Sequence, residues 1–172
     1  MRVYHELEPI YNSFSRVLIL GSLPSVKSRE IGFYYAHPQN RFWKILEILF
    51  HVDLPDVNTK KQFLLSRGIA LWDTVSSCEI IGSSDASIRE IEVNDLTPIL
   101  QKSQITFIFC TGRKSYDLYC KYMEPKTRIK AILLPSPSAA NARCSLASLV
   151  SSYHIIKDCL TSIPKNEISM VQ

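Results

Sequence analysis

The stretch VLILGSLPS, residues 17–25, decides the fold of this chain. Its first part, Val17–Leu20, is a short continuous apolar run, which is typical of a strand buried on both faces of a parallel sheet. Gly21 and Pro24 end that run, so the chain turns there. The segment YYAHPQNRFWK, residues 34–44, follows closely and is rich in rings and polar groups. The stretch therefore predicts an α/β protein with a functional site just past its first strand.

Beyond this stretch, the sequence predicts three further strands separated by helices. The strands are Ile69–Trp72, Ile105–Cys110 and Ile129–Leu134. The helices are Arg41–Phe50, Asn58–Arg67, a helix capped by Asn94 that runs to Gln101, Arg113–Met123 and Ser145–Leu160, while Ser76–Ile91 is expected to be a loop. This alternation predicts a three-layer α/β/α sandwich with a central four-stranded parallel sheet. We expect one domain over residues 1–164 and a frayed tail at residues 165–172.

Composition narrows the class of protein. The chain has 172 residues and a formal net charge of +4, which permits an anionic partner such as nucleic acid but does not require one. Its cysteines and histidines are too widely spaced for a disulfide framework, an iron–sulfur cluster or a metal site. No segment has the pattern of a signal peptide or a membrane span. The sequence therefore predicts a cytoplasmic monomer without metal or cofactor.

The carboxyl ends of the predicted strands should meet at one edge of the sheet, where ligands bind in such folds. They carry GSLPS, the segment after Trp72, the turn Cys110–Gly112 and the run Leu134–Ser138. A G-x-S-x-G elbow, a phosphate-binding glycine loop and a G-x-G-x-x-G pattern are all missing. The remaining rings, amides and small Ser/Pro loops suit a flat ligand with polar edges, such as a nucleobase.

Three blocks at these strand ends carry a family resemblance. GSLPS (21–25), GFYYAHPQNRFWK (32–44) and LPSPSAAN (134–141), in this order, resemble the uracil-DNA glycosylase superfamily, and the middle block resembles its mismatch-specific members. With ALWD (70–73) and the Ser84–Asp85 loop, the match is most similar to the hypoxanthine (deoxyinosine) DNA glycosylase branch. The resemblance implies an α/β/α sandwich, a flipped base, and DNA containing a deaminated base as partner.

The resemblance also implies roles for individual residues. Asn40 would orient the attacking water, although an Asn at a helix start also suits an N-cap. Leu23 stands where the mismatch-specific enzymes have an Asn. The resemblance to the hypoxanthine branch implies instead that the Asn of the second block, Asn40 here, is the catalytic residue. Tyr35 would stack on the flipped base, or else simply cover the core. Asp73 would accept a hydrogen bond from N1–H of hypoxanthine, or else end its strand as a turn residue. Backbone groups of Ser22 and Leu23 would read the base edge as well.

Other residues are assigned to the DNA or to the framework. Ser136, Pro137 and Ser138 would press into the minor groove and contact phosphates, or else only terminate a strand. Five basic residues flank these loops and together could neutralise phosphates, namely Lys27, Arg29, Arg41, Lys44 and Arg143. Phe42 and Trp43 are expected in the core and His37 in a structural role. Asp85 is a turn residue or an alternative catalyst.

These observations predict a monofunctional DNA glycosylase that hydrolyses the N-glycosidic bond of a deaminated base, with hypoxanthine as first candidate. Uracil and xanthine remain open as alternative bases. A non-catalytic nucleic-acid-binding protein also remains open, because Leu23 cannot position water.

Overall fold

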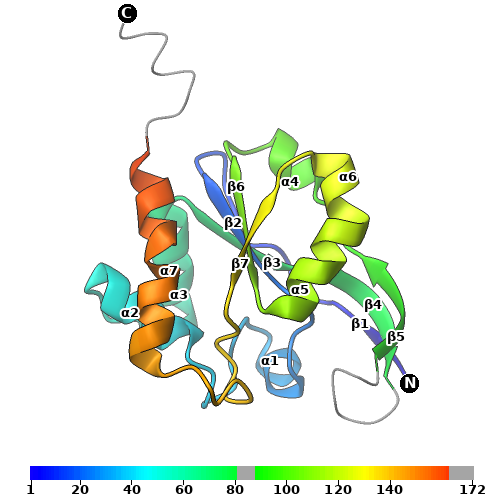
Figure 1. Ribbon diagram of the computed structural model, residues 1–172, viewed down its shortest axis with the longest axis horizontal. Helices are drawn as coiled ribbons and strands as arrows, with labels where there is room; N and C mark the ends of the chain where they lie inside the picture. The colour runs from blue at the N-terminus through cyan, green and yellow to red at the C-terminus, as the bar shows by residue number, and fades with distance from the viewer. Residues whose placement is uncertain (81–87, 163–172) are drawn as a thin grey trace, which may run out of the picture.

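The computed structural model describes residues 1–80 and 88–162, which form a central parallel sheet between two layers of helices (Figure 1). The strand order is β3-β2-β6-β7. The strands are β2 (Val17–Gly21), β3 (Ile69–Asp73), β6 (Phe107–Thr111) and β7 (Ala131–Leu134). In the register of the sheet, Leu18 of β2 lies between Ala70 of β3 and Ile108 of β6. The predicted sandwich with a four-stranded parallel sheet is confirmed.

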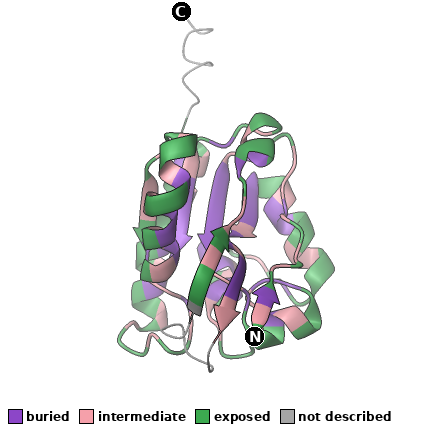
Figure 2. Cartoon of the chain, turned by 90° about the vertical axis from the view of Figure 1, so that its right-hand side faces the viewer, coloured by how far each residue is buried: buried purple, intermediate pink, exposed green. Residues whose placement is uncertain are grey.

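Each face of the sheet has its own cover of helices. One face packs against α2 (Phe42–Phe50), α3 (Val57–Arg67) and α7 (Leu146–Thr161). The other packs against α4 (Thr97–Gln101), α5 (Arg113–Leu118), a π-helical turn (Tyr119–Met123) and α6 (Glu124–Thr127). Val17 and Ile19 belong to the first core and Leu18 and Leu20 to the second, because successive side chains of a strand point to opposite faces. All four side chains are fully buried, as are most residues of the sheet (Figure 2).

The prediction of a loop at Ser76–Ile91 is wrong for the described residues. A second, antiparallel sheet stands there, with order β1-β4-β5, built from β1 (Arg2–Tyr4), β4 (Val75–Ile80) and β5 (Ile88–Val93). The polar residues led to the wrong prediction because β4 depends on pairing with a strand on each side. One of these partner strands lies more than 70 residues upstream, so the local sequence does not reveal it. Ser84, Asp85 and the predicted tail at 165–172 lie outside the described residues.

Several boundaries also differ from the prediction. Asn94 does not cap a helix; its side-chain amide donates to the carbonyl oxygens of Asp73 at 2.8 Å and Val75 at 3.3 Å, and α4 begins only at Thr97. The predicted helix Arg113–Met123 changes to a π-helical turn at Tyr119. A short helix that was not predicted, α1 (Val26–Ile31), follows β2, with Ser25 as N-cap and left-handed Gly32 at its end.

Among the described residues, no helix combines the length and hydropathy that crossing a bilayer demands.

Candidate active site

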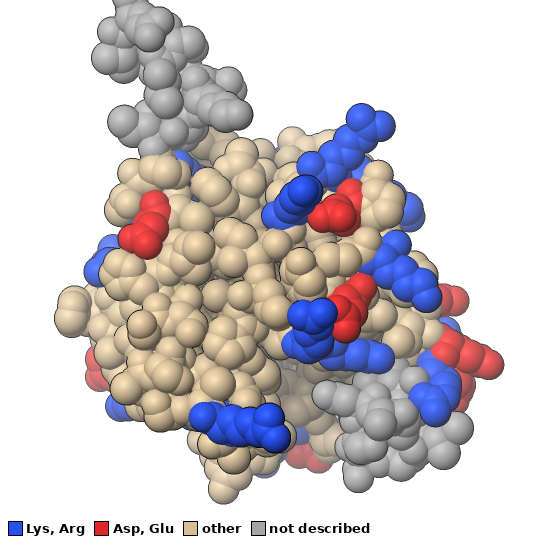
Figure 3. Space-filling view, in the orientation of Figure 1, with Lys and Arg blue, Asp and Glu red and all other residues tan. Residues whose placement is uncertain are grey.

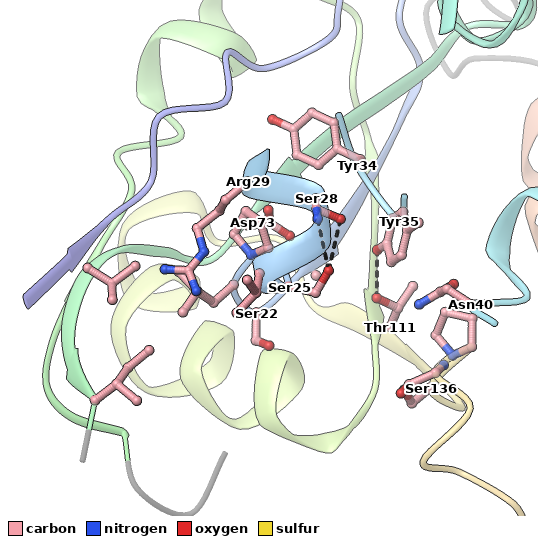
Figure 4. A pocket seen from close by; sticks show the side chains of 18 of the residues that line it. Ser22, Ser25, Ser28, Arg29, Tyr34, Tyr35, Asn40, Asp73, Thr111 and Ser136 are labelled. Carbon is pink, nitrogen blue, oxygen red and sulfur yellow. Dashed lines mark hydrogen bonds between the residues drawn. The ribbon is translucent and has the colours of Figure 1, made fainter. Parts of the chain in front are cut away.

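A cavity of about 590 Å³ opens at the carboxyl ends of the parallel strands (Figure 4), within the roughly 300–1,000 Å³ typical of small-ligand sites. Every site residue predicted from the sequence lines it: Ser22, Leu23, Tyr35, Asn40, Asp73, Ser136, Pro137 and Ser138. These residues come from the ends of β2, β3 and β7 and from the segment before α2. The structure therefore brings the predicted residues together, while their roles stay predictions.

Tyr35 is held rigidly at one wall of the cavity. Its ring stacks on Phe42, with centroids 4.0 Å apart, and its backbone adopts a left-handed φ of 51°. Thr111 Oγ1 donates to the carbonyl of Leu20, so the Tyr35 hydroxyl donates to Thr111 over 2.8 Å. Burial, helped by the nearby Asp73 carboxylate, raises the pKa of the Tyr35 phenol above its ordinary value. Tyr35 therefore stays neutral and offers a fixed aromatic face rather than a proton.

Asn40 lines the cavity and also supports the start of α2, while its catalytic role stays a prediction. Its Oδ1 accepts a hydrogen bond from the backbone N–H of Phe42 at 2.9 Å, which steadies the start of α2. This bond fixes the orientation of the amide. Two Nδ2 donors and one lone pair of Oδ1 remain for water or substrate. Figure 4 shows Asn40 beside Thr111 and Ser136 at the cavity wall.

Asp73 lies on the cavity floor beside Gly21, and its side chain is only 5% exposed. Its Oδ2 contacts Nε2 of His5 at 2.7 Å. A Cβ added to Gly21 would lie 2.4 Å from Asp73 Oδ1 and 3.1 Å from the Tyr35 hydroxyl. Glycine at residue 21 therefore leaves the room that this carboxylate oxygen occupies.

The residues directly after the end of β2 offer backbone N–H donors. The carbonyl of Ser22 already accepts from the N–H of Val75 at 2.9 Å. Among the described residues, none accepts a hydrogen bond from the N–H of Ser22 or Leu23. The Leu23 side chain packs against Val75, Cys78 and Leu118 while also lining the cavity. These two N–H groups are thus free to bind acceptors on a ligand.

The loop after β7 is held in place by hydrogen bonds from Arg41, the residue directly before α2. Arg41 donates through its side chain to four backbone carbonyl oxygens, those of Pro137, Ser138 (2.9 Å), Asn141 (3.0 Å) and Cys144. Its backbone N–H also donates to Pro137 O at 2.9 Å. Asn141 Nδ2 donates to Ser136 O at 3.0 Å and closes the turn. Ser136, Pro137 and Ser138 are therefore presented to the cavity in one fixed conformation.

These contacts correct part of the predicted phosphate-binding group. Arg41 is engaged by the loop and does not face solvent as a free cation. Lys27 lies 4.0 Å from Glu30, and on the face shown in Figure 3 basic and acidic side chains are interspersed. Arg29 does line the cavity, and its Nε is buried without a hydrogen-bond partner among the described residues. Within this group, Arg29 is the residue that lines the cavity, whereas Lys44 and Arg143 are exposed outside it.

Sequence reasoning missed three contributors to the site: His5, Arg29 as a lining residue, and Thr111. Thr111 ends β6 in the turn already singled out, so its position was a usable signal. His5 had none, because it reaches Asp73 from 68 residues away. The described residues contain no cluster of three or more His, Cys, Asp or Glu side chains arranged to hold a metal ion.

Known proteins share this sequence and architecture. Residues 8–154 match the model of the Uracil DNA glycosylase superfamily. A Methanosarcina barkeri protein named hypoxanthine DNA glycosylase is 31% identical over 150 residues, covering 84% of this chain and 92% of that protein. A Methanosarcina acetivorans protein of the same name is 33% identical over 136 residues, covering 76% and 84%. An NMR structure from Methanosarcina acetivorans, named for uracil DNA glycosylase, has a TM-score of 0.75 and 27% identity, and the match covers 91% of this chain and 99% of that one.

The fold, the cavity and the sequence matches together identify this protein as a DNA glycosylase, and its substrate is therefore DNA. The chain belongs to the uracil DNA glycosylase superfamily. The resemblance of the three sequence blocks and the predicted class of enzyme are thereby confirmed.

Proposed function

We propose that this enzyme removes hypoxanthine from deoxyinosine in DNA by hydrolysis of the N-glycosidic bond. The observation that carries the proposal is the single cavity that joins the Tyr35 ring, the Asp73 carboxylate and the Asn40 amide. The two relatives named hypoxanthine DNA glycosylase support the choice of base. The predictions of a monomer and of a cytoplasmic location remain predictions.

Base recognition follows from the groups that face the cavity. The flipped base stacks on Tyr35, whose other face is already covered by Phe42. Asp73 Oδ1 accepts from N1–H, while the free N–H groups of Ser22 and Leu23 bind carbonyl or ring acceptors. Extruding the nucleotide costs a few kcal/mol, and less at a poorly paired base such as hypoxanthine.

Bond cleavage then needs a positioned water and a stabilised leaving base. As the glycosidic bond lengthens, the sugar gains oxocarbenium character, as in other glycoside hydrolyses. Asn40 orients the water through its amide, which the bond to Phe42 N–H keeps in place. Backbone N–H dipoles at the end of β2 stabilise charge on the departing base without reorganisation. The loop 136–138 contacts the sugar-phosphate backbone beside the extruded nucleotide.

A panel of oligonucleotides tests the proposal. Strands carrying hypoxanthine, uracil, xanthine or a thymine mismatch should show hypoxanthine excised fastest, measured as alkali-labile abasic sites in single-turnover reactions. Borohydride should trap no protein–DNA adduct, because none of the described residues lining the cavity is a lysine and water is the expected nucleophile. A trapped adduct would contradict hydrolysis by water. Fastest excision of uracil would replace hypoxanthine as substrate, and binding without strand cleavage would leave a non-catalytic protein.

Leu23 supplies a second prediction, about the choice between purine and pyrimidine. Its apolar wall favours the larger ring surface of a purine, whereas an amide there could hydrogen-bond a uracil edge. Leu23→Asn should therefore raise the uracil rate by about tenfold relative to the hypoxanthine rate, the scale of one hydrogen bond.

The control for this substitution is Leu133→Asn, because Leu133 is partly exposed on β7 and does not line the cavity. Circular dichroism should show both variants folded, since Leu23 also packs against the cluster of Val75, Cys78 and Leu118. A folded Leu23→Asn variant with the wild-type ratio of uracil to hypoxanthine rates would refute the purine-wall explanation.

A further inference from the structure

The segment before residue 8 lies outside the family match but inside the architecture of the site. Strand β1 pairs with β4 in the register Val3 to Cys78, and the N–H of His5 donates to Ser76 O at 2.7 Å. Met1 and Val3 line the cavity. This N-terminal strand is therefore part of the cavity wall.

His5 directly follows this strand, and its side chain is buried, at 1% exposure. Its ring lies between Tyr34 and Trp72, each 6.2 Å away between centroids. Both neighbours are tied to the backbone that follows His5: the Tyr34 hydroxyl donates to Glu8 O at 2.8 Å and Trp72 Nε1 donates to Leu7 O at 3.3 Å. Among these neighbours, the imidazole lies with Nε2 on Asp73 Oδ2.

The contact with His5 determines which carboxylate oxygen of Asp73 is available to a ligand. With Oδ2 held by His5, the carboxylate plane is fixed and Oδ1 lies over Gly21, where no described residue donates a hydrogen bond to it. A buried polar group without a hydrogen-bond partner is costly, and the contact with His5 offsets that cost at Oδ2. A carboxylate oxygen accepts hydrogen bonds. The imidazole thus positions Oδ1 as the acceptor that is left for a ligand.

A hydrogen-bond acceptor at the position of Asp73 Oδ1 distinguishes hypoxanthine from adenine, the base from which it forms by deamination. Hypoxanthine carries a hydrogen on N1, while N1 of adenine is itself an acceptor. The Asp73 carboxylate oxygen can accept a hydrogen bond from N1–H of hypoxanthine, whereas it would face N1 of adenine acceptor to acceptor.

We propose that His5 is a positioning residue for base selection: through Asp73 it makes the cavity select bases that present an N–H at this edge and reject adenine. The inference rests on the proposed function, because it places the base edge at Asp73. His5 itself does not line the cavity and does not touch the base.

The test measures base reading by equilibrium binding, which does not depend on cleavage. Duplexes carry a non-cleavable 2′-fluoro-deoxyinosine or 2′-fluoro-deoxyadenosine at the target position. Wild type should prefer the deoxyinosine duplex. His5→Leu should lower that preference by about tenfold to a hundredfold, the scale of one charge-assisted hydrogen bond. His5→Gln, whose amide can donate to Asp73, should restore it to within about threefold.

Two further comparisons separate positioning from a general loss of structure. In an Asp73→Asn background, His5→Leu should change the preference little, because the pair acts as one unit. His154→Leu is the matched control, because His154 on α7 also pairs with an Asp but is 57% exposed and does not line the cavity. Thermal melting should show every variant folded, with His5→Gln available if His5→Leu is not.

The outcomes distinguish this inference from the proposed function. A folded His5→Leu variant with wild-type preference would overturn the role of His5, as would an equal loss in the Asp73→Asn background. A wild type that does not discriminate between the two duplexes would overturn it too. If wild type discriminates and His5 matters, but cleavable deoxyinosine is not excised, hypoxanthine excision fails and the role of His5 in base reading stands.

Discussion

Asn40→Ala is expected to lower the single-turnover rate of hypoxanthine excision by about a hundredfold or more, the scale for losing one catalytic dipole. The reason is geometric: Asn40 lines the cavity, and its amide orientation is set by the 2.9 Å bond from Phe42 N–H to Oδ1. Alanine removes every group that could hold the water. It also removes the support of the first turn of α2, which should cost about 1 kcal/mol of stability.

Asn40→Asp separates these contributions. The carboxylate keeps an oxygen for Phe42 N–H and for water but lacks the Nδ2 donors. A rate close to wild type in this variant would assign catalysis to the oxygen, and a loss as large as that of alanine would assign it to the N–H group. A folded Asn40→Ala enzyme that excises hypoxanthine at the wild-type rate would remove Asn40 from the mechanism.

Arg41→Ala should produce the largest loss of stability among the residues around the cavity, roughly 3 kcal/mol, about the net value of two charge-assisted hydrogen bonds. The guanidinium binds four carbonyl oxygens of the loop after β7, including that of Ser138 at 2.9 Å. Without it the loop loses its conformation, and a misplacement of about 1 Å near the reacting groups can cost a hundredfold in rate. Denaturant unfolding and single-turnover excision measure the two effects.

Arg41→Lys is the informative partner, because an ammonium cannot span four carbonyl oxygens as a planar guanidinium does. It should fall between wild type and Arg41→Ala in both measurements. Arg113→Ala is the control, since Arg113 is 73% exposed and contacts Asp117 and the Tyr116 ring on its own helix, α5, so its change in stability should stay within about 0.5 kcal/mol. An Arg41→Ala protein as stable and as active as wild type would show that the loop does not depend on these bonds.

The sequence predicted the parallel sheet well because its strands can be recognised from short apolar runs in the local sequence. Val17–Leu20 is apolar throughout and ends in Gly21, and α2 shows Phe42, Ile45 and Leu49 at helical spacing, all buried. Strand β4 could not be recognised in this way. Its mixed polar sequence becomes a strand through partners at both edges, and one of them is β1.

The residues of the candidate site also fall into two groups, those that the sequence predicted and those that it did not. Residues at strand ends, such as Asp73 and Ser136, were found because parallel strands bring their carboxyl ends together. Their hydrogen-bond partners were not found, since the bonds of His5 to Asp73 and of Arg41 to the loop depend on side-chain packing between distant segments. Arg41 was assigned to phosphates because a basic residue beside a DNA-binding loop has no sequence mark of an internal role.

The central place of β2 has a consequence for synthesis of the chain. The strand leaves the ribosome before β3 and β6, but Leu18 must pair with Ala70 of β3 on one side and Ile108 of β6 on the other. Parallel pairs between such distant residues form slowly, and an apolar strand with open edges is prone to aggregation in the meantime. Asn40 and Tyr35 are likewise made long before Thr111, which completes the wall of their cavity. A nascent chain that stalls before β6 therefore exposes β2 with one edge unpaired and carries Asn40 and Tyr35 without the completed cavity.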